Sequence, residues 1–162
     1  MFKGFYHSKS GDLVMGSDGE YLTDLCFVSS SHAEKVCQYE EKSLPIFEQT
    51  RKWLDIYFSG QVPDFTPPIK LLNLSHFRQQ VISKIALIPY GQTLTYGEIA
   101  KQVAKERGLQ KMSAQAVGSC AKNNPICLIV PCHRVVGKNN KLVGYNGGLD
   151  KKIDLLKLEK II

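Results

Sequence analysis

Residues 1–28 carry a pattern of hydrophobic and polar positions that is typical of short strands. The strand-like segments are Met1–Tyr6, Asp12–Gly16 and Glu20–Val28. Between the last two, Ser17-Asp18-Gly19 supplies the Asp-Gly pair that favours a tight hairpin. The chain is therefore predicted to begin with a β-hairpin lobe.

A helical period follows the strand-like segments. The apolar positions of one predicted helix face are Ile46, Trp53, Leu54, Tyr57 and Phe58. Ser43-Leu44-Pro45 precedes them and Gly60 follows them, as helix start and stop signals do, so one amphipathic helix of about 15 residues is predicted. Residues 61–68 then contain three of the seven prolines, which continue neither a helix nor a central strand. A boundary before Ser75 is predicted, which divides the chain into residues 1–75 and 76–162.

The second half is richer in helix signals. Apolar residues from Phe77 to Ile88 lie three or four apart, and Pro89 ends that segment. Thr95-Tyr96-Gly97-Glu98 has the capping-box pattern, which predicts a helix beginning at Tyr96. Another short helix is predicted from Ser113 to Lys122. Two short helices joined by a loop favour a helix-turn-helix, although this connecting segment is longer than the usual three or four residues.

Composition is that of a folded protein. Of the 162 residues, 43% are hydrophobic and 22% are charged, which excludes a disordered or fibrous chain. No apolar run reaches the roughly 18 residues that a membrane helix needs, and the N-terminus resembles no signal peptide. The five cysteines form no Cys-X-X-Cys pair. We expect reduced thiols and a soluble cytoplasmic protein, or a nuclear one in a eukaryote, without a membrane partner.

Charge is distributed unevenly along the chain. Residues 1–76 hold seven Lys/Arg and ten Asp/Glu, a net charge of −3, whereas residues 77–162 hold fourteen and five, a net charge of +9. The asymmetry favours a polyanionic partner for the second half, such as nucleic acid, although lysines on a solvated face would produce the same numbers.

A reactive pair follows a short apolar run. Ile126–Val130 is predicted to be a buried strand that leads into Pro131-Cys132-His133-Arg134. A base near a cysteine favours the thiolate, which is the nucleophilic form. Adjacent residues of an extended strand point to opposite faces, so Cys132 and His133 interact only if the backbone bends or a water bridges them. A buried structural cysteine beside an unrelated histidine is the alternative.

An acid is expected on the buried side of the C-terminal helix. Asp150–Ile162 is predicted to be helical, and Glu159 falls angularly between the apolar residues Leu155, Leu156 and Ile162. A buried carboxylate needs a partner, and the ring N–H of His133 is a suitable one. The alternative places Glu159 in solvent at the end of the chain or beside a lysine.

The segment around this pair resembles a known family. Pro131-Cys132-His133-Arg134-Val135, preceded by Asn124-Pro125 and followed by Gly144-Tyr145-Asn146-Gly147-Gly148, is similar to the signature of the O6-alkylguanine-DNA alkyltransferases, also called methylated-DNA–protein-cysteine methyltransferases. The resemblance extends from about Phe77 to Glu159. It implies an α/β (α+β) fold with an RNase H-like N-terminal lobe of a small sheet and a helix. The implied C-terminal lobe has a winged-helix-like helix-turn-helix and an active-site strand.

The resemblance implies repair of DNA by direct damage reversal. The helix-turn-helix would bind double-stranded DNA through the minor groove and flip an O6-alkylguanine, or an O4-alkylthymine, into a pocket. Cys132 would take the alkyl group irreversibly, once per molecule. His133 would act as base through a water, Glu159 would orient His133, and Asn124 would brace the turn. A monomer without cofactor or metal is implied.

The resemblance also assigns residues that contact the DNA or the flipped base. Tyr96 matches a tyrosine that helps rotate the target nucleotide, and Ala114 is the small residue that opens the recognition helix. The residues that line or cover the base pocket are Val135, Tyr145, Asn146 and Gly147. The predicted phosphate contacts are Lys101, Lys105, Lys111 and Lys122. Tyr96 could alternatively be a packed residue, and Asn124 a turn or capping residue.

One position departs from the family pattern. The arginine that fills the gap left by the flipped base aligns with Gln115. Glutamine is shorter and uncharged, so weaker DNA binding or slower flipping is expected. Arg107 or Lys111 could compensate from the loop before it, which is longer than in the compact members of the family.

Other readings of the sequence are weaker. A lesion-binding module that recruits repair factors would have no use for Cys132, and a thiol hydrolase would need an oxyanion hole for which there is no signal. The candidate zinc ligands His7, Cys26, His32, Cys37 and His76 match no metal-binding spacing. No structural zinc is therefore expected.

Overall fold

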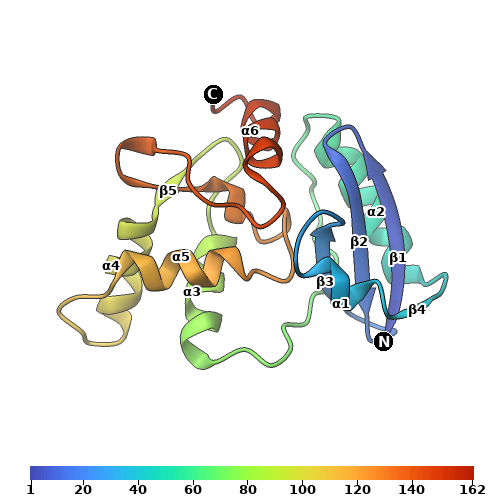
Figure 1. Ribbon diagram of the computed structural model, residues 1–162, viewed down its shortest axis with the longest axis horizontal. Helices are drawn as coiled ribbons and strands as arrows, with labels where there is room; N and C mark the ends of the chain where they lie inside the picture. The colour runs from blue at the N-terminus through green and yellow to red at the C-terminus, as the bar shows by residue number, and fades with distance from the viewer.

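The strand-like segments at the start of the chain pair into a sheet in the computed structural model, which describes all 162 residues (Figure 1). Strands β1 (Phe2–Ser8), β2 (Gly11–Ser17) and β3 (Leu22–Phe27) are antiparallel, and the short β4 (Glu40–Glu41) runs parallel to β1. The sheet order is β3-β2-β1-β4. The predicted hairpin is confirmed: Asp18 Oδ1 accepts the N–H groups of Glu20 and Tyr21, and Gly19 has a φ of +111°.

Helices cover both faces of this sheet. Helix α2 (Pro45–Phe58) is the predicted amphipathic helix, with proline in its first turn. It packs on the face formed by Leu13, Met15, Leu25 and Phe27. The short helix α1 (Ala33–Val36) covers Val14 and Cys26 on the other face. Side chains alternate between the two faces of a strand, so β2 is buried on both sides.

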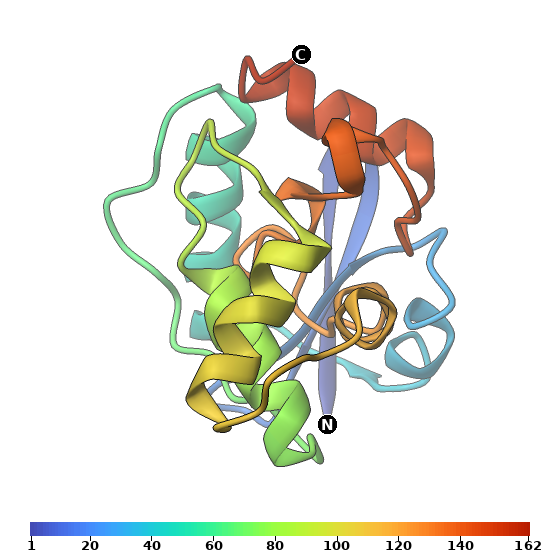
Figure 2. The same ribbon diagram turned by 90° about the vertical axis from the view of Figure 1, so that its left-hand side faces the viewer.

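The C-terminal half is helical, as the sequence signals predict. Helix α3 (His76–Ala86) begins after Ser75, whose hydroxyl accepts the N–H of Arg78. Helix α4 (Tyr96–Glu106) has the predicted capping box, in which Thr95 and Glu98 satisfy each other's backbone N–H groups. Helix α5 (Ala114–Lys122) begins after Ser113, which caps it. Figure 2 shows α3 and α4 side by side, with α5 seen nearly end-on.

Helices α4 and α5 form the helix-turn-helix, and residues 107–113 connect them. The last helix, α6 (Leu149–Leu158), lies between the helical half and the sheet at the top of Figure 1. It ends before the predicted Ile162, and Glu159 is its C-terminal cap residue. No helix is both long enough and apolar enough to span a lipid bilayer.

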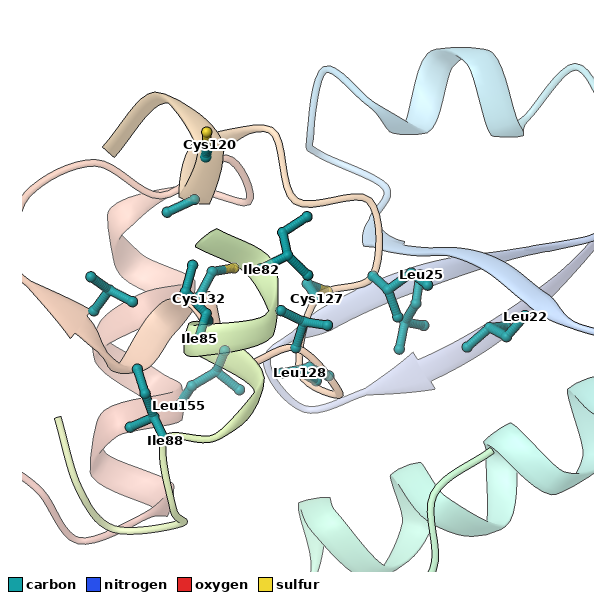
Figure 3. Packing of buried hydrophobic residues seen from close by; sticks show 14 of the residues in the cluster. Leu22, Leu25, Ile82, Ile85, Ile88, Cys120, Cys127, Leu128, Cys132 and Leu155 are labelled. Carbon is teal, nitrogen blue, oxygen red and sulfur yellow. The ribbon is translucent and has the colours of Figure 1, made fainter. Parts of the chain in front are cut away.

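One hydrophobic core joins the two halves. It contains 27 buried residues, contributed by the sheet, by helices α2 to α6 and by the segment from Ile126 to Val135, with Ile88 beside them. Figure 3 shows Cys127 and Leu128 between Leu25 of β3 and Ile82 of α3. The loop that precedes the Pro-Cys-His-Arg segment is therefore packed between the two halves of the molecule.

The predicted strand over Ile126–Val130 is wrong. The segment is a series of turns with isolated bridges, among them Leu25–Ile126 and Cys127–Val130, and Leu128 adopts a φ of +68°. These residues are apolar because they lie in the core between the halves, which a short apolar run cannot distinguish from a buried strand.

Candidate active site

Cys132 lies at the start of a bend and not on a strand. Residues Cys132–Arg134 form a single 3₁₀ turn, η1, and β6 (Val135–Val136) follows it and pairs in parallel with β5 (Leu94–Thr95). This corrects the predicted active-site strand: the strand comes directly after the cysteine. Cys132 is 6% exposed, and Figure 3 shows it in the core near Ile82, Ile85 and Leu155.

Asn124 holds the turn that leads to Cys132. Its Nδ2 donates to the carbonyls of Ile126 and Val130, at 3.3 and 2.8 Å, and lies 3.2 Å from Cys132 Sγ. Its Oδ1 accepts the N–H of Ile126 at 3.1 Å. Asn124 is 5% exposed. A single amide side chain thus stabilises the turn and places an N–H against the sulfur, where it favours the thiolate.

His133 and Glu159 are in direct contact inside the protein. Their side chains are 0% exposed, and His133 Nε2 lies 2.6 Å from Glu159 Oε1. In the neutral imidazole this geometry places the proton on Nε2, which donates to the carboxylate. The Nδ1 atom is then the acceptor, and it is buried without a hydrogen-bond partner in the protein. The free lone pair of His133 is therefore available for a proton.

Glu159 receives further donors that the sequence reasoning did not assign. Arg134 makes a bidentate contact, Nε to Oε2 at 2.8 Å and Nη2 to Oε1 at 2.9 Å. Tyr57 from α2 donates its hydroxyl to Oε1 at 2.7 Å, and the N–H of Gly91 reaches Oε2 at 3.1 Å. A buried carboxylate with this many donors has a fixed orientation.

The surroundings set the protonation states of these groups. Burial raises the pKa of the Cys132 thiol, against the opposing effects of the Asn124 N–H and the Lys152 ammonium. Burial also lowers the pKa of His133, although Glu159 opposes the shift. For Glu159, burial works to raise the pKa, but hydrogen bonds from His133 and Arg134 outweigh it and lower the pKa to about 2. At neutral pH the site holds a thiol, a neutral imidazole and a carboxylate.

Lys152 is a further buried residue near Cys132 that was not predicted from the sequence. It is 0% exposed, and its Nζ donates to the carbonyls of Val135 at 2.6 Å and Val143 at 3.2 Å. Burial lowers the pKa of this ammonium to about 8, and the nearby Cys132 thiolate would work against that shift. A sequence signal exists: Lys152 precedes the buried Leu155 and Leu156 by three and four residues, so it falls on the apolar face of α6.

Four of the predicted DNA-facing residues, which are Tyr96, Ala114, Gln115 and Lys122, line one open groove. Gly118, Val143 and Gly144 line it as well, and its volume is about 470 Å³. The hydroxyl of Tyr96 donates to the carbonyl of Val143 at 3.3 Å. Gln115, in the first turn of α5, is exposed.

The two residues suggested as substitutes for the arginine do not line the groove of Gln115. The guanidinium of Arg107 stacks over Phe77, and its Nη1 donates to Gln80 on α3. Lys111 lines a separate groove with Lys101 and Lys105. Val135 is fully buried and is not among the residues that line the groove of Gln115 or the cavity beside Cys132.

Tyr145, Asn146 and Gly147 close a small cavity beside the thiol. Its volume is about 20 Å³, and Cys132, Cys127 and Asn124 form its inner wall. The sheet contributes Cys26 and Phe27 to the same cavity. All five cysteines are free thiols. No group of three or more His, Cys, Asp or Glu side chains is arranged to hold a metal ion.

Two family models together match almost the whole chain. The ribonuclease-like domain of 6-O-methylguanine DNA methyltransferase matches residues 1–71, and the DNA binding domain of 6-O-methylguanine DNA methyltransferase matches residues 76–161. The chain belongs to the 6-O-methylguanine DNA methyltransferase family. This membership confirms the family and the fold that the Pro-Cys-His-Arg segment implied.

Individual family members are similar over nearly the full length. A methylated-DNA–protein-cysteine methyltransferase of Mycobacterium leprae is 39% identical over 154 residues, which cover 94% of this chain and 88% of the relative. One from Methanosarcina acetivorans is 36% identical over 160 residues, 98% of both chains. The crystal structure of Mycobacterium tuberculosis OGT in complex with DNA has a TM-score of 0.86 at 35% identity and covers 99% of this chain and 93% of that one.

Proposed function

We propose that this protein repairs DNA by direct damage reversal, in which an alkyl group on O6 of guanine is transferred to Cys132. The observation that carries the proposal is the buried Cys132, whose sulfur accepts a hydrogen bond from Asn124 and which directly precedes the hydrogen-bonded pair His133–Glu159. The chain also belongs to this methyltransferase family. A nucleophile with a base that is itself oriented by a carboxylate is the arrangement that activates a thiol.

The proton moves before the alkyl group does. His133 Nδ1 accepts the proton of the Cys132 thiol through a water molecule, and Glu159 stabilises the imidazolium that forms. The Asn124 N–H and the Lys152 ammonium stabilise the thiolate. The sulfur then attacks the alkyl carbon, so that a C–S bond forms while the C–O6 bond breaks. The electron pair of that bond stays on the guanine, which takes up one proton and is restored.

The transfer inactivates the protein molecule irreversibly. The product is a thioether, and neither His133 nor water has a route to hydrolyse it. Each protein molecule therefore accepts one alkyl group. The reaction exchanges a C–O bond for a C–S bond and needs no cofactor.

The helix-turn-helix supplies the DNA contact. Helix α5 enters the minor groove, with Ala114 close to the DNA backbone and Gln115 at the gap left by the flipped base. Tyr96, which lines the groove beside α5, helps rotate the nucleotide towards Cys132. The lysines at positions 101, 105, 111 and 122 neutralise phosphates. The protein acts on DNA as a monomer. We place it in the cytoplasm, because its named relatives come from bacteria and archaea.

Intact mass tests the proposed reaction. The protein is incubated with a duplex that carries one O6-methylguanine, and a digest locates the added mass. One methyl group on the peptide that contains Cys132 is the expected result. Cys132→Ala abolishes the addition, whereas Cys127→Ala, which changes a neighbouring thiol in the same cavity, preserves it. Binding of the lesion duplex without any methyl transfer would instead make the protein a lesion-binding module.

A further inference from the structure

The loop that closes the cavity beside Cys132 is held from the other half of the molecule. We call residues Gly144–Gly148 the substrate loop and residues Val28–Ser31, which join β3 to α1, the serine loop. Ser29 Oγ donates to the carbonyl of Gly147 at 3.0 Å, and Ser31 Oγ donates to Asn146 Oδ1 at 3.0 Å. Neither hydroxyl takes part in the chemistry proposed above.

Phe27 of β3 packs against the substrate loop. A Cβ atom on Gly147 would come within 2.8 Å of the Phe27 ring. The ring of Tyr145 lies edge-on to Phe27, with 6.4 Å between the centroids. Phe27 is 1% exposed, so its position is fixed by the core. The substrate loop can lie this close to β3 only because residue 147 has no side chain.

The substrate loop has a flexible type of residue at each end. Gly144 has a φ of +54° and Gly148 a φ of +105°. Glycine changes between such conformations at little cost, so both ends can absorb a movement of the residues between them. The hydrogen bonds that tie those residues to the N-terminal half come from Ser29 and Ser31. The two serines thus restrain a segment that has a glycine at each end, of which Gly148 also caps α6 and donates its N–H to the carbonyl of Tyr145.

The position of the substrate loop determines the room beside the thiol. The cavity between Cys132, Tyr145 and Gly147 holds about 20 Å³, which is on the order of the space that one water molecule needs. This space is too small for a guanine base, so the substrate loop must move outward when the flipped base enters. A benzyl substituent on that base requires a larger outward movement than a methyl group does.

We propose that Ser29 and Ser31 are positioning residues that hold the substrate loop against the thiol and thereby restrict the reaction to small O6 substituents. The proposal rests on the proposed function, because it names the class of alkyl group that the same site accepts. Loss of the two hydroxyls lets the loop move outward, which favours a bulky group relative to a methyl group.

The test compares two duplexes, one with O6-methylguanine and one with O6-benzylguanine. The rate of transfer to the protein is followed by intact mass under single-turnover conditions. In the double variant Ser29→Ala/Ser31→Ala, the ratio of the benzyl rate to the methyl rate rises about fivefold or more, as expected for the loss of one or two hydrogen bonds. Ser59→Ala is the matched control, since that hydroxyl bonds only the carbonyl of Ile56 at the end of α2.

Conservative variants separate positioning from a general effect on folding. Ser29→Thr/Ser31→Thr keeps both hydroxyls and keeps the ratio of the unchanged protein. If the double alanine variant does not fold, Ser31→Ala at the surface shifts the ratio in the same direction. An unchanged ratio in folded alanine variants, with normal methyl transfer, overturns the role of the serines and leaves the proposed function intact. Absence of any transfer by the unchanged protein overturns both.

Discussion

Arg134 and Glu159 form a bidentate ion pair inside the protein, with N–O distances of 2.8 and 2.9 Å and the carboxylate fully enclosed. Arg134 also donates Nη1 to the carbonyl of Ile88 at 2.7 Å. The charge of the carboxylate is thus balanced by the guanidinium, and His133 can remain neutral while it is bonded to Glu159. The arginine of the Pro-Cys-His-Arg segment orients the acid that orients the base.

Removal of this guanidinium should destabilise the protein strongly. Arg134→Met leaves a buried carboxylate without its cation, and the expected loss is about 3–5 kcal/mol of unfolding free energy. Urea denaturation measures it. The control is Arg51→Met, which breaks the partly exposed pair with Glu48 and one hydrogen bond to the carbonyl of Phe5 and should cost no more than about 2 kcal/mol. Equal losses in the two variants would contradict a special role for the buried pair.

Stability should fall as the pH is lowered, in two steps. The pKa of His133 lies below its ordinary value of 6.5 in the folded protein. As the pH falls through 6.5, the unfolded chain therefore binds more protons at this residue than the folded protein does, and the free energy of unfolding decreases. The pKa of Glu159 is about 2 in place of 4.5, so its contribution is present above pH 4.5 and is lost between about 4.5 and 2. Urea denaturation from neutral to acidic pH measures both steps.

The Glu159→Gln variant tests which group produces the lower step. The amide does not titrate, so this variant should start from a lower stability at neutral pH and lose less on further acidification below about pH 4.5. The same acid dependence in Glu159→Gln as in the unchanged protein would assign the step to other carboxyl groups.

The helices were predictable because their ends are encoded locally. The capping box at Thr95 and Glu98 and the cap at Ser75 depend on residues three apart, so the sequence alone predicts where α4 and α3 begin. Ile126–Val130 was misread because five apolar residues carry no period that separates a buried strand from a buried turn. The turn is determined instead by the side chain of Asn124.

The partners of Glu159 were harder to predict because they are distant in sequence. Tyr57 is 102 positions from Glu159, and it donates from a helix of the other half. No local pattern connects them, and only the packing of α2 against the end of α6 brings the hydroxyl to the carboxylate. Glu159 itself was predictable, because its angular position in the predicted helix placed an acid beside Leu155 and Leu156, which are buried. Ile162, expected on the same buried side, is exposed because the helix ends at Leu158.

Lys152 should influence the chemical step more than DNA binding. Lys152→Met keeps the length of the side chain but removes the donors to Val135 and Val143 and the positive charge near Cys132. We expect the transfer rate to fall by about tenfold or more, while affinity for undamaged duplex stays the same. Lys151→Met is the control, since this neighbouring ammonium pairs with the exposed Asp150. A parallel loss of affinity and rate in Lys152→Met would point to DNA binding instead.

Gln115 should limit how well the duplex is held open. The residue is exposed in the first turn of α5 at the groove shared with Tyr96, which neither Arg107 nor Lys111 lines. Gln115→Arg supplies a planar, charged group that stacks better in the gap of a flipped base. Its transfer rate on duplex DNA should rise, with a smaller effect on the free base O6-methylguanine, which needs no flipping. Gln110→Arg adds the same charge in the α4–α5 connection, so an equal rise in both variants would show general attraction to DNA and not a role at the gap.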